Sequence, residues 1–341
     1  MRKVFFSLLI VADFIPFIFF MQNETLESVT QAISYEGYDM TAKVSNGKIA
    51  AGIIGIVVIL AFVIATIILI RKKQKGNGFG ILGGVITYIS FNYFAPSLLI
   101  NLIFVYSSFK KYADSANKVI VSTAAFIIVY TLSTAFLAVL GRMLANKVFA
   151  YRLKSFGEGF SFGQGIAYTQ AAFTMSSLFQ LVSPMIIINR SGLETLVSGA
   201  KDQEAATKML DSAMELIGYK TSAIVMLTIV AVLFVIYQLA ITIPMYAAYQ
   251  KKIHKGYYGM VLGSYIVIEA IQYMAERKVI NVIVQLIATA VVVAAITYVC
   301  IRIYNKCYKD EERDLDKEKE DKIKKMTTAK KIPRFENLSN L

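Results

Sequence analysis

Long apolar stretches, separated by short polar and charged segments, make up most of this chain. Each stretch is close to the ~20 residues that an α-helix needs to cross the hydrocarbon core of a bilayer. The alternation of apolar and polar residues expected for the strands of a membrane barrel is absent. The pattern predicts an all-α, polytopic transmembrane bundle of eight helices, over residues 4–21, 49–70, 79–108, 119–140, 160–188, 222–246, 257–274 and 279–303.

The polar segments suggest a division into regions. Residues 1–21 resemble a secretory signal without a clear cleavage site, so we expect a retained signal-anchor helix. Residues 22–48 follow as an extracytoplasmic loop, 49–305 as a seven-helix membrane domain, and 306–341 as a charged cytoplasmic tail. In the extracytoplasmic segment 191–220, apolar residues recur at helical spacing, which predicts an amphipathic helix.

The positions of the charges support a membrane protein rather than a nucleic-acid-binding one. The net charge of the 341 residues is +13 and the mean hydropathy is +0.57. The basic clusters at Arg71–Lys75 and Lys251–Lys255 and the tail from Lys306 lie at helix ends, and alternation of eight spans puts them on one side. Because basic residues concentrate on the cytoplasmic side, we expect both termini to be cytoplasmic. Membrane lipid is an expected partner, and nucleic acid is not.

The few potential metal ligands are poorly placed for a metal or cofactor site. Cys300 and Cys307 lie near the cytoplasmic end of the last predicted helix, and the single histidine, His254, lies in a basic loop. No metal and no cofactor are predicted. The absence of tryptophan, the many lysines and the five prolines are typical of a Gram-positive bacterium with an AT-rich genome.

Several polar residues fall inside the predicted membrane helices, where they are costly unless they face protein or water. We therefore predict an interior binding cavity lined by Asn92, Arg142, Gln164, Tyr168, Gln238 and Glu269. Gly159 and Gly163, four residues apart, predict a close helix–helix contact beside this cavity.

Three short motifs carry a resemblance to a known family. Arg142 matches the arginine of a Glu-Glu-x-x-Arg motif. The segment Gly163–Tyr168 matches a Gly-His-Gly-Gly-x-Glu pattern, and Tyr265–Glu269 matches a late His-x-x-x-Asp motif. With these motifs, the chain from about Val44 to Tyr308 resembles the YhfC family of intramembrane proteases, relatives of the CAAX-processing and bacteriocin-processing enzymes. The resemblance implies a protease-like membrane fold.

The positions that the resemblance makes catalytic carry other residues here. Ala138 and Val139 replace the paired acids, Gln164 replaces a histidine, Tyr168 replaces a glutamate and Tyr265 replaces the second histidine. Glu269 alone keeps an acid. Peptide hydrolysis needs a general base, and neither an amide nor an aliphatic side chain can take up the proton. The resemblance therefore implies a degenerate member without catalytic residues.

Three functions remain open from the sequence. The first is a catalytically inactive scaffold that binds another membrane protein or a peptide. The second is an active intramembrane protease that uses Glu269. The third is the membrane subunit of a transporter, in which Pro96, Pro184 and Pro244 would mark hinges or broken helices.

Overall fold

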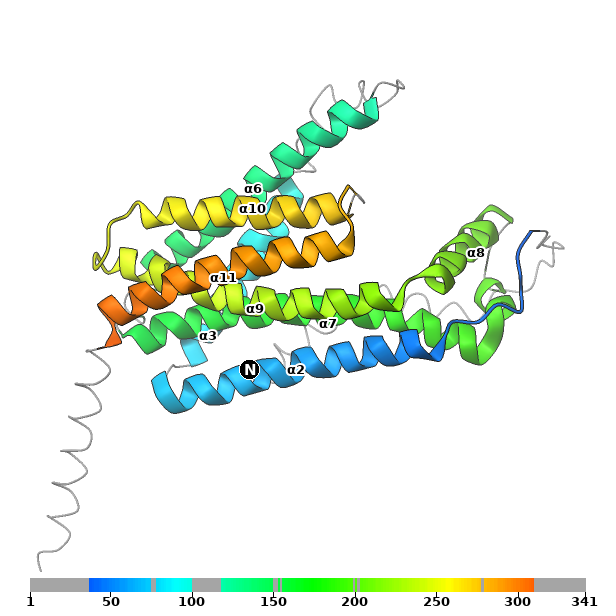
Figure 1. The fold of residues 1–341 in the computed structure, drawn as a ribbon, viewed down its shortest axis with the longest axis horizontal. Helices are drawn as coiled ribbons and strands as arrows, with labels where there is room; N and C mark the ends of the chain where they lie inside the picture. Colours follow the sequence, from blue (N-terminus) through cyan, green and yellow to red (C-terminus); the bar gives the residue numbers. More distant parts are fainter. Residues whose placement is uncertain are drawn as a thin grey trace, which may run out of the picture. The chain divides into compact units, whose positions relative to one another are not determined.

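The computed structural model describes residues 37–74, 78–99, 118–149, 153, 155–198, 200, 203–276 and 279–309. Throughout these ranges the regular structure is helical (Figure 1). In chain order the elements are α2 (Asn46–Gln74), α3 (Gly78–Thr87), the π-helix η1 (Tyr88–Phe94), α6 (Lys118–Val148), α7 (Phe156–Val197), α8 (Gln203–Gly218), α9 (Thr221–Tyr249), α10 (Tyr257–Glu276) and α11 (Val282–Cys307).

Long apolar helices identify an all-α, multi-pass membrane protein, as the sequence predicts. Within the described ranges, six segments are long and apolar enough to cross a bilayer: Asn46–Ile70, Gly78–Leu99, Ile128–Val148, Phe156–Thr195, Thr221–Tyr249 and Val282–Cys307. The predicted span 4–21 lies outside the described residues. The predicted span 257–274 does form a helix, α10, but it is not among the six because glycines, tyrosines and polar residues such as Glu269 lower its hydropathy.

Helix boundaries differ most from the prediction where the backbone is irregular. The stretch predicted as one helix over 79–108 contains the π-helix η1, just before Pro96. A proline has no N–H to donate, so an ordinary i→i+4 bond cannot form at that point. In addition, α7 extends well beyond the predicted 160–188 and is kinked at Gly192, whose φ of 79° suits a residue without a Cβ.

Contacts along the chain divide it into two units. One comprises Met1–Ile53 and Phe179–Thr221, and the other comprises Ile54–Leu178 and Ser222–Leu341. The described parts of the predicted loop 22–48 and of the segment 191–220, which the sequence alone treats separately, therefore belong to the same unit. Helices α2 and α7 each contribute to both units.

In the first unit, α8 is the amphipathic helix that the sequence predicts. Ala206, Leu210 and Ala213 are buried along one face of it. Val44 and Asn189 form two reciprocal hydrogen bonds of 2.7 Å, between the Val44 backbone and the Asn189 side chain. The Tyr38 hydroxyl donates to the Asp211 carboxylate on α8 at 2.7 Å. These bonds join the segment before α2 to α7 and α8.

In the second unit, glycines allow α3 and α7 to touch backbone to backbone. A Cβ on Gly84 would overlap the carbonyl oxygen of Phe162, and one on Gly165 would overlap the carbonyl oxygen of Ile81. Larger residues at these positions would force the two helices apart. The close contact holds the amino-terminal half of α7 in place, where several of the predicted site residues lie.

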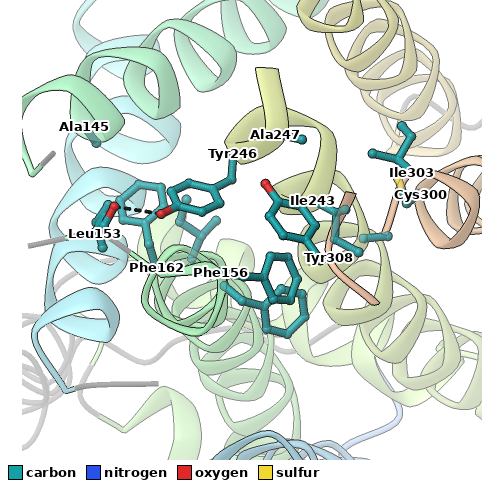
Figure 2. Close-up of a cluster of buried hydrophobic side chains, with 13 residues drawn as sticks. Ala145, Leu153, Phe156, Phe162, Ile243, Tyr246, Ala247, Cys300, Ile303 and Tyr308 are labelled. Carbon is teal, nitrogen blue, oxygen red and sulfur yellow. Dashed lines mark hydrogen bonds between the residues drawn. The ribbon is translucent and has the colours of Figure 1, made fainter. Parts of the chain in front are cut away.

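Aromatic residues pack together where α9 and α11 end and α7 begins (Figure 2). The rings of Phe156 and Tyr308 lie 4.2 Å apart between centroids. The Tyr246 hydroxyl donates to the backbone carbonyl of Leu153 at 2.7 Å, and Gln250 bonds to both Tyr246 and Tyr308. This cluster fixes the end of α11 against the end of α9.

Candidate functional site

A buried arginine is the central feature of the second unit. Arg142, on α6, is only 1% exposed, although it lies in a helix that is apolar enough to cross a membrane. A charged side chain in such a place is costly unless other groups solvate it. The side chain of Arg142 lies among polar residues of other helices.

Three neutral side chains receive hydrogen bonds from the guanidinium group of Arg142. Its Nη1 donates to Thr242 Oγ1 at 3.0 Å, and its Nη2 donates to Gln238 Oε1 and to Tyr265 Oη, the latter at 3.3 Å. Two of these partners lie on α9 and one on α10. The forked, planar guanidinium can bond to several acceptors at once, which an ammonium group cannot do in this geometry.

Gln238 connects the members of this network to one another. Its Oε1 accepts from Arg142 and also from the Tyr265 hydroxyl, at 2.7 Å. Its Nε2 donates to Gln170 Oε1 on α7, also at 2.7 Å. The Thr242 hydroxyl donates to the backbone carbonyl of Gln238 at 2.8 Å. The five residues Arg142, Gln170, Gln238, Thr242 and Tyr265 therefore form one polar network, supplied by four helices.

A glycine on α7 makes room for this network. A Cβ on Gly163 would overlap the side chain of Thr242, and a Cβ on Gly159 would lie 2.6 Å from the ring of Tyr246. Both glycines therefore face α9, as the four-residue spacing predicts. The close approach lets Thr242 reach Arg142 without a side chain from α7 between the helices.

Gln164 and Tyr168 form a separate pair. Gln164 is 2% exposed, and its Nε2 donates to the Tyr168 hydroxyl, one turn later on α7, at 2.9 Å. The Thr66 hydroxyl on α2 lies 3.3 Å from the same oxygen. The described bonds of Gln164 thus lead toward α2 rather than to Arg142.

Glu269 lies one turn after Tyr265 on α10 and is half-buried. It acts electrostatically on Tyr88 of η1 and on Tyr237 of α9, so its carboxylate is near both tyrosines. Tyr237 in turn bonds to Ser264 at 2.7 Å and packs edge-to-face on the ring of Tyr265. Glu269 is therefore beside the polar network, and none of the described hydrogen bonds of Arg142 is to it.

The two positions that would carry paired acids are apolar and packed. Ala138 and Val139 are buried in a cluster with Tyr237, Ile241 and Tyr265.

Asn92 of η1 has a buried Oδ1 without a partner among the described residues, and the same is true of Arg142 Nε. Asn92 lies in the same π-helix as Tyr88. Ala138 and Val139, in contrast, contribute to the apolar packing of the core.

The network can donate hydrogen bonds and hold one positive charge, but it contains no carboxylate and no imidazole, the groups that most often act as general bases. Its members are an arginine, two glutamines, a threonine and a tyrosine. Over the described ranges, no group of three His, Cys, Asp or Glu residues is arranged as a metal site. His254 is exposed in the loop before α10, where its Nδ1 accepts from the backbone of Gly256.

Sequence reasoning missed Thr242 and left Gln170 out of the proposed cavity. The sequence does contain a pattern that points to Thr242, because Gln238 and Thr242 are one turn apart on α9 and therefore share a face of that helix. Their pairing with Arg142 depends on which faces of α6 and α9 meet, and helical spacing within one segment does not determine that.

Comparisons with known proteins return no match. No family model, no curated protein and no solved structure matches this chain.

Proposed function

We propose that this protein is a catalytically inactive membrane protein that binds another membrane protein or a peptide and acts as its scaffold. One observation carries the proposal. Arg142, Gln170, Gln238, Thr242 and Tyr265 bond to one another in a network without a carboxylate or an imidazole, and the positions that would carry paired acids are packed as core. A network of this kind stabilises helix packing rather than activating water.

The resemblance to the YhfC family is part of this proposal, with the chain as a degenerate member. We also propose that both termini are cytoplasmic and that the host is a Gram-positive bacterium. The basic ends of α9 and α11 support the orientation, since Lys251, Lys255, Lys306 and Lys309 lie at one end of the second unit.

Orientation can be tested by cysteine labelling in intact cells. With Cys300 and Cys307 replaced by serine, a cysteine at Ser198 should react with an impermeant reagent, and one at Lys255 should react only after lysis. Labelling of Lys255→Cys but not Ser198→Cys in intact cells would reverse the orientation.

Co-purification in mild detergent tests the scaffold function. A second protein or a peptide should be recovered in a fixed ratio to the wild-type chain. This bound polypeptide should have its full length, because a scaffold does not cleave it. Gln164→Ala and Tyr168→Phe should retain it. The first change removes the bond from Gln164 to Tyr168, and the second also removes the bond from Thr66; a side-chain hydrogen bond in a membrane bundle is worth on average about 0.6 kcal/mol.

An active protease that uses Glu269 is the second candidate. It is favoured by the position of this carboxylate beside Tyr88, Tyr237 and Tyr265. Glu269→Gln keeps the shape and removes the proton acceptor. If the bound polypeptide is truncated with the wild-type protein and intact with a folded Glu269→Gln variant, the scaffold proposal is wrong. A co-purified ATPase would instead indicate a transporter subunit.

A further inference from the structure

Exposed lysines gather at the end of the second unit where α9 and α11 end and α10 begins. Lys251 and Lys255 lie in the loop between α9 and α10, and Lys306 and Lys309 lie at the end of α11. We call these four residues the basic rim. The sequence contains no aspartate or glutamate from 249 to 258 or from 300 to 309, and the next acids, Asp310, Glu311 and Glu312, follow Lys309 directly.

Specific contacts hold the two parts of the basic rim together. The Lys252 ammonium lies 4.2 Å from the centroid of the Tyr308 ring and 3.4 Å from the backbone carbonyl oxygen of Cys307. The Tyr308 hydroxyl donates to Gln250 Oε1 at 3.0 Å. Because Lys252 and Gln250 belong to the α9–α10 connection, these contacts hold together the two segments that carry the four exposed lysines.

Aromatic side chains accompany these lysines, as is typical of a bilayer interface. Tyr257 and Tyr258 begin α10, and Tyr304 precedes the lysines of α11. A hollow of about 230 Å³ lies beside the loop, lined by His254, Gly256, Tyr257 and Met260. Tyrosine rings and lysine side chains at the ends of apolar helices are the features that membrane proteins show at headgroup depth.

We propose that the basic rim binds the phosphate groups of anionic phospholipids, with the hollow beside Tyr257 receiving part of one lipid. Four exposed ammonium groups attract an anionic surface, and the contacts between Lys252, Cys307 and Tyr308 keep the two segments that carry them together. Charge complementarity selects the anionic lipid over a zwitterionic one. The site is independent of the scaffold function and of Arg142.

The absence of tryptophan permits a direct test. A single Tyr257→Trp substitution places one fluorescent reporter in the hollow, and brominated lipids quench it on contact. In mixed bilayers, a brominated anionic phospholipid should bind at this reporter at least about fivefold more strongly than a brominated zwitterionic one, the factor that one lysine near an anionic surface supplies. The preference should weaken as salt is added.

Two comparisons decide the outcome. Combining Tyr257→Trp with Lys251→Gln, Lys255→Gln, Lys306→Gln and Lys309→Gln should bring the ratio close to one, while far-ultraviolet circular dichroism confirms the helices. A Tyr219→Trp reporter, placed just before α9 at its other end, should show no comparable preference. If the protein with all four lysines binds the anionic and the zwitterionic lipid equally, the proposal is wrong. Equal binding would also result if the acidic stretch 310–321 neutralised the basic rim.

An unchanged ratio in the fourfold glutamine variant would equally refute it. Addition of inorganic phosphate at constant ionic strength separates lipid from free anion. Loss of the preference would mean that the rim binds phosphate itself, whereas an unchanged ratio supports the lipid.

Discussion

Two glutamines organise two polar clusters of the second unit, and their surroundings differ sharply. Gln238 in α9 joins Arg142, Tyr265 and Gln170, and it is 2% exposed. Gln250, just after α9, joins Tyr246 and Tyr308 and is only half-buried. Both clusters combine glutamine, tyrosine and a basic residue. The guanidinium of Arg142 is enclosed in the first cluster, whereas Lys252, which lies against Tyr308 in the second, is partly exposed.

This contrast indicates what each cluster contributes. In the interior, each donor and acceptor that loses its partner stays without water, so removing one member is costly. The Gln250 side chain is half-buried, so water can replace part of what is lost there. We therefore expect the same substitution to have a large effect at Gln238 and a small one at Gln250.

The largest effect should follow from Gln238→Leu. This change leaves the Tyr265 hydroxyl and Gln170 without their partner and removes one acceptor from the buried Arg142. We expect a loss of about 3 kcal/mol in the free energy of unfolding, at the low end of values for breaking a buried charged pair. Gln250→Leu should cost less than about 1 kcal/mol. Reversible unfolding in mixed micelles measures both, and equal losses would contradict the comparison.

Gly163→Leu should cost somewhat less, about 2 kcal/mol, because a side chain there must displace Thr242 or separate α7 from α9. Gly263→Leu on α10 is the matched control, since a Cβ at Gly263 meets nothing within 4 Å. Thermal unfolding of the two variants should differ clearly. If Gly263→Leu destabilises the protein as much as Gly163→Leu does, the close α7–α9 contact is not the cause.

Substitutions of Arg142 itself separate charge from shape. Arg142→Met removes the buried charge and fills similar space, while Gln238 keeps its bonds to Tyr265 and Gln170, so the stability should change by less than about 1 kcal/mol. Arg142→Lys keeps the charge and loses the fork, and it should be the less stable of the two variants. The reverse order in the same unfolding assay would show that the guanidinium shape is unimportant.

The smallest effect concerns a carboxylate outside both clusters. Asp39, in the first unit, accepts hydrogen bonds from the side chain and backbone of Thr41, and these bonds lower its pKa below 3.8. A lowered pKa means that the stabilisation is present above the unfolded value of 3.8 and is lost as the pH falls through the folded value. An NMR titration of the Asp39 carboxyl should show this pKa, and Thr41→Val should raise it toward 3.8.

The sequence alone determined the fold class, because apolar stretches of bilayer length allow only helices. The same periodic pattern predicted α8, and the spacing of Gly159 and Gly163 predicted a close contact. Arg142, Gln238 and Tyr265 could also be named, since a polar residue in an apolar helix must face something other than lipid.

Only the tertiary structure decided which of these residues meet. Gln164 was grouped with Arg142 by their shared polarity, but the structure pairs it with Tyr168, while Thr242 and Gln170 bond to the arginine network instead. The reason is physical: periodicity fixes the angle of a residue around its own helix, whereas a hydrogen bond requires the faces and heights of two helices to match. Contacts far apart in the chain, such as Gly163 on Thr242, set that match.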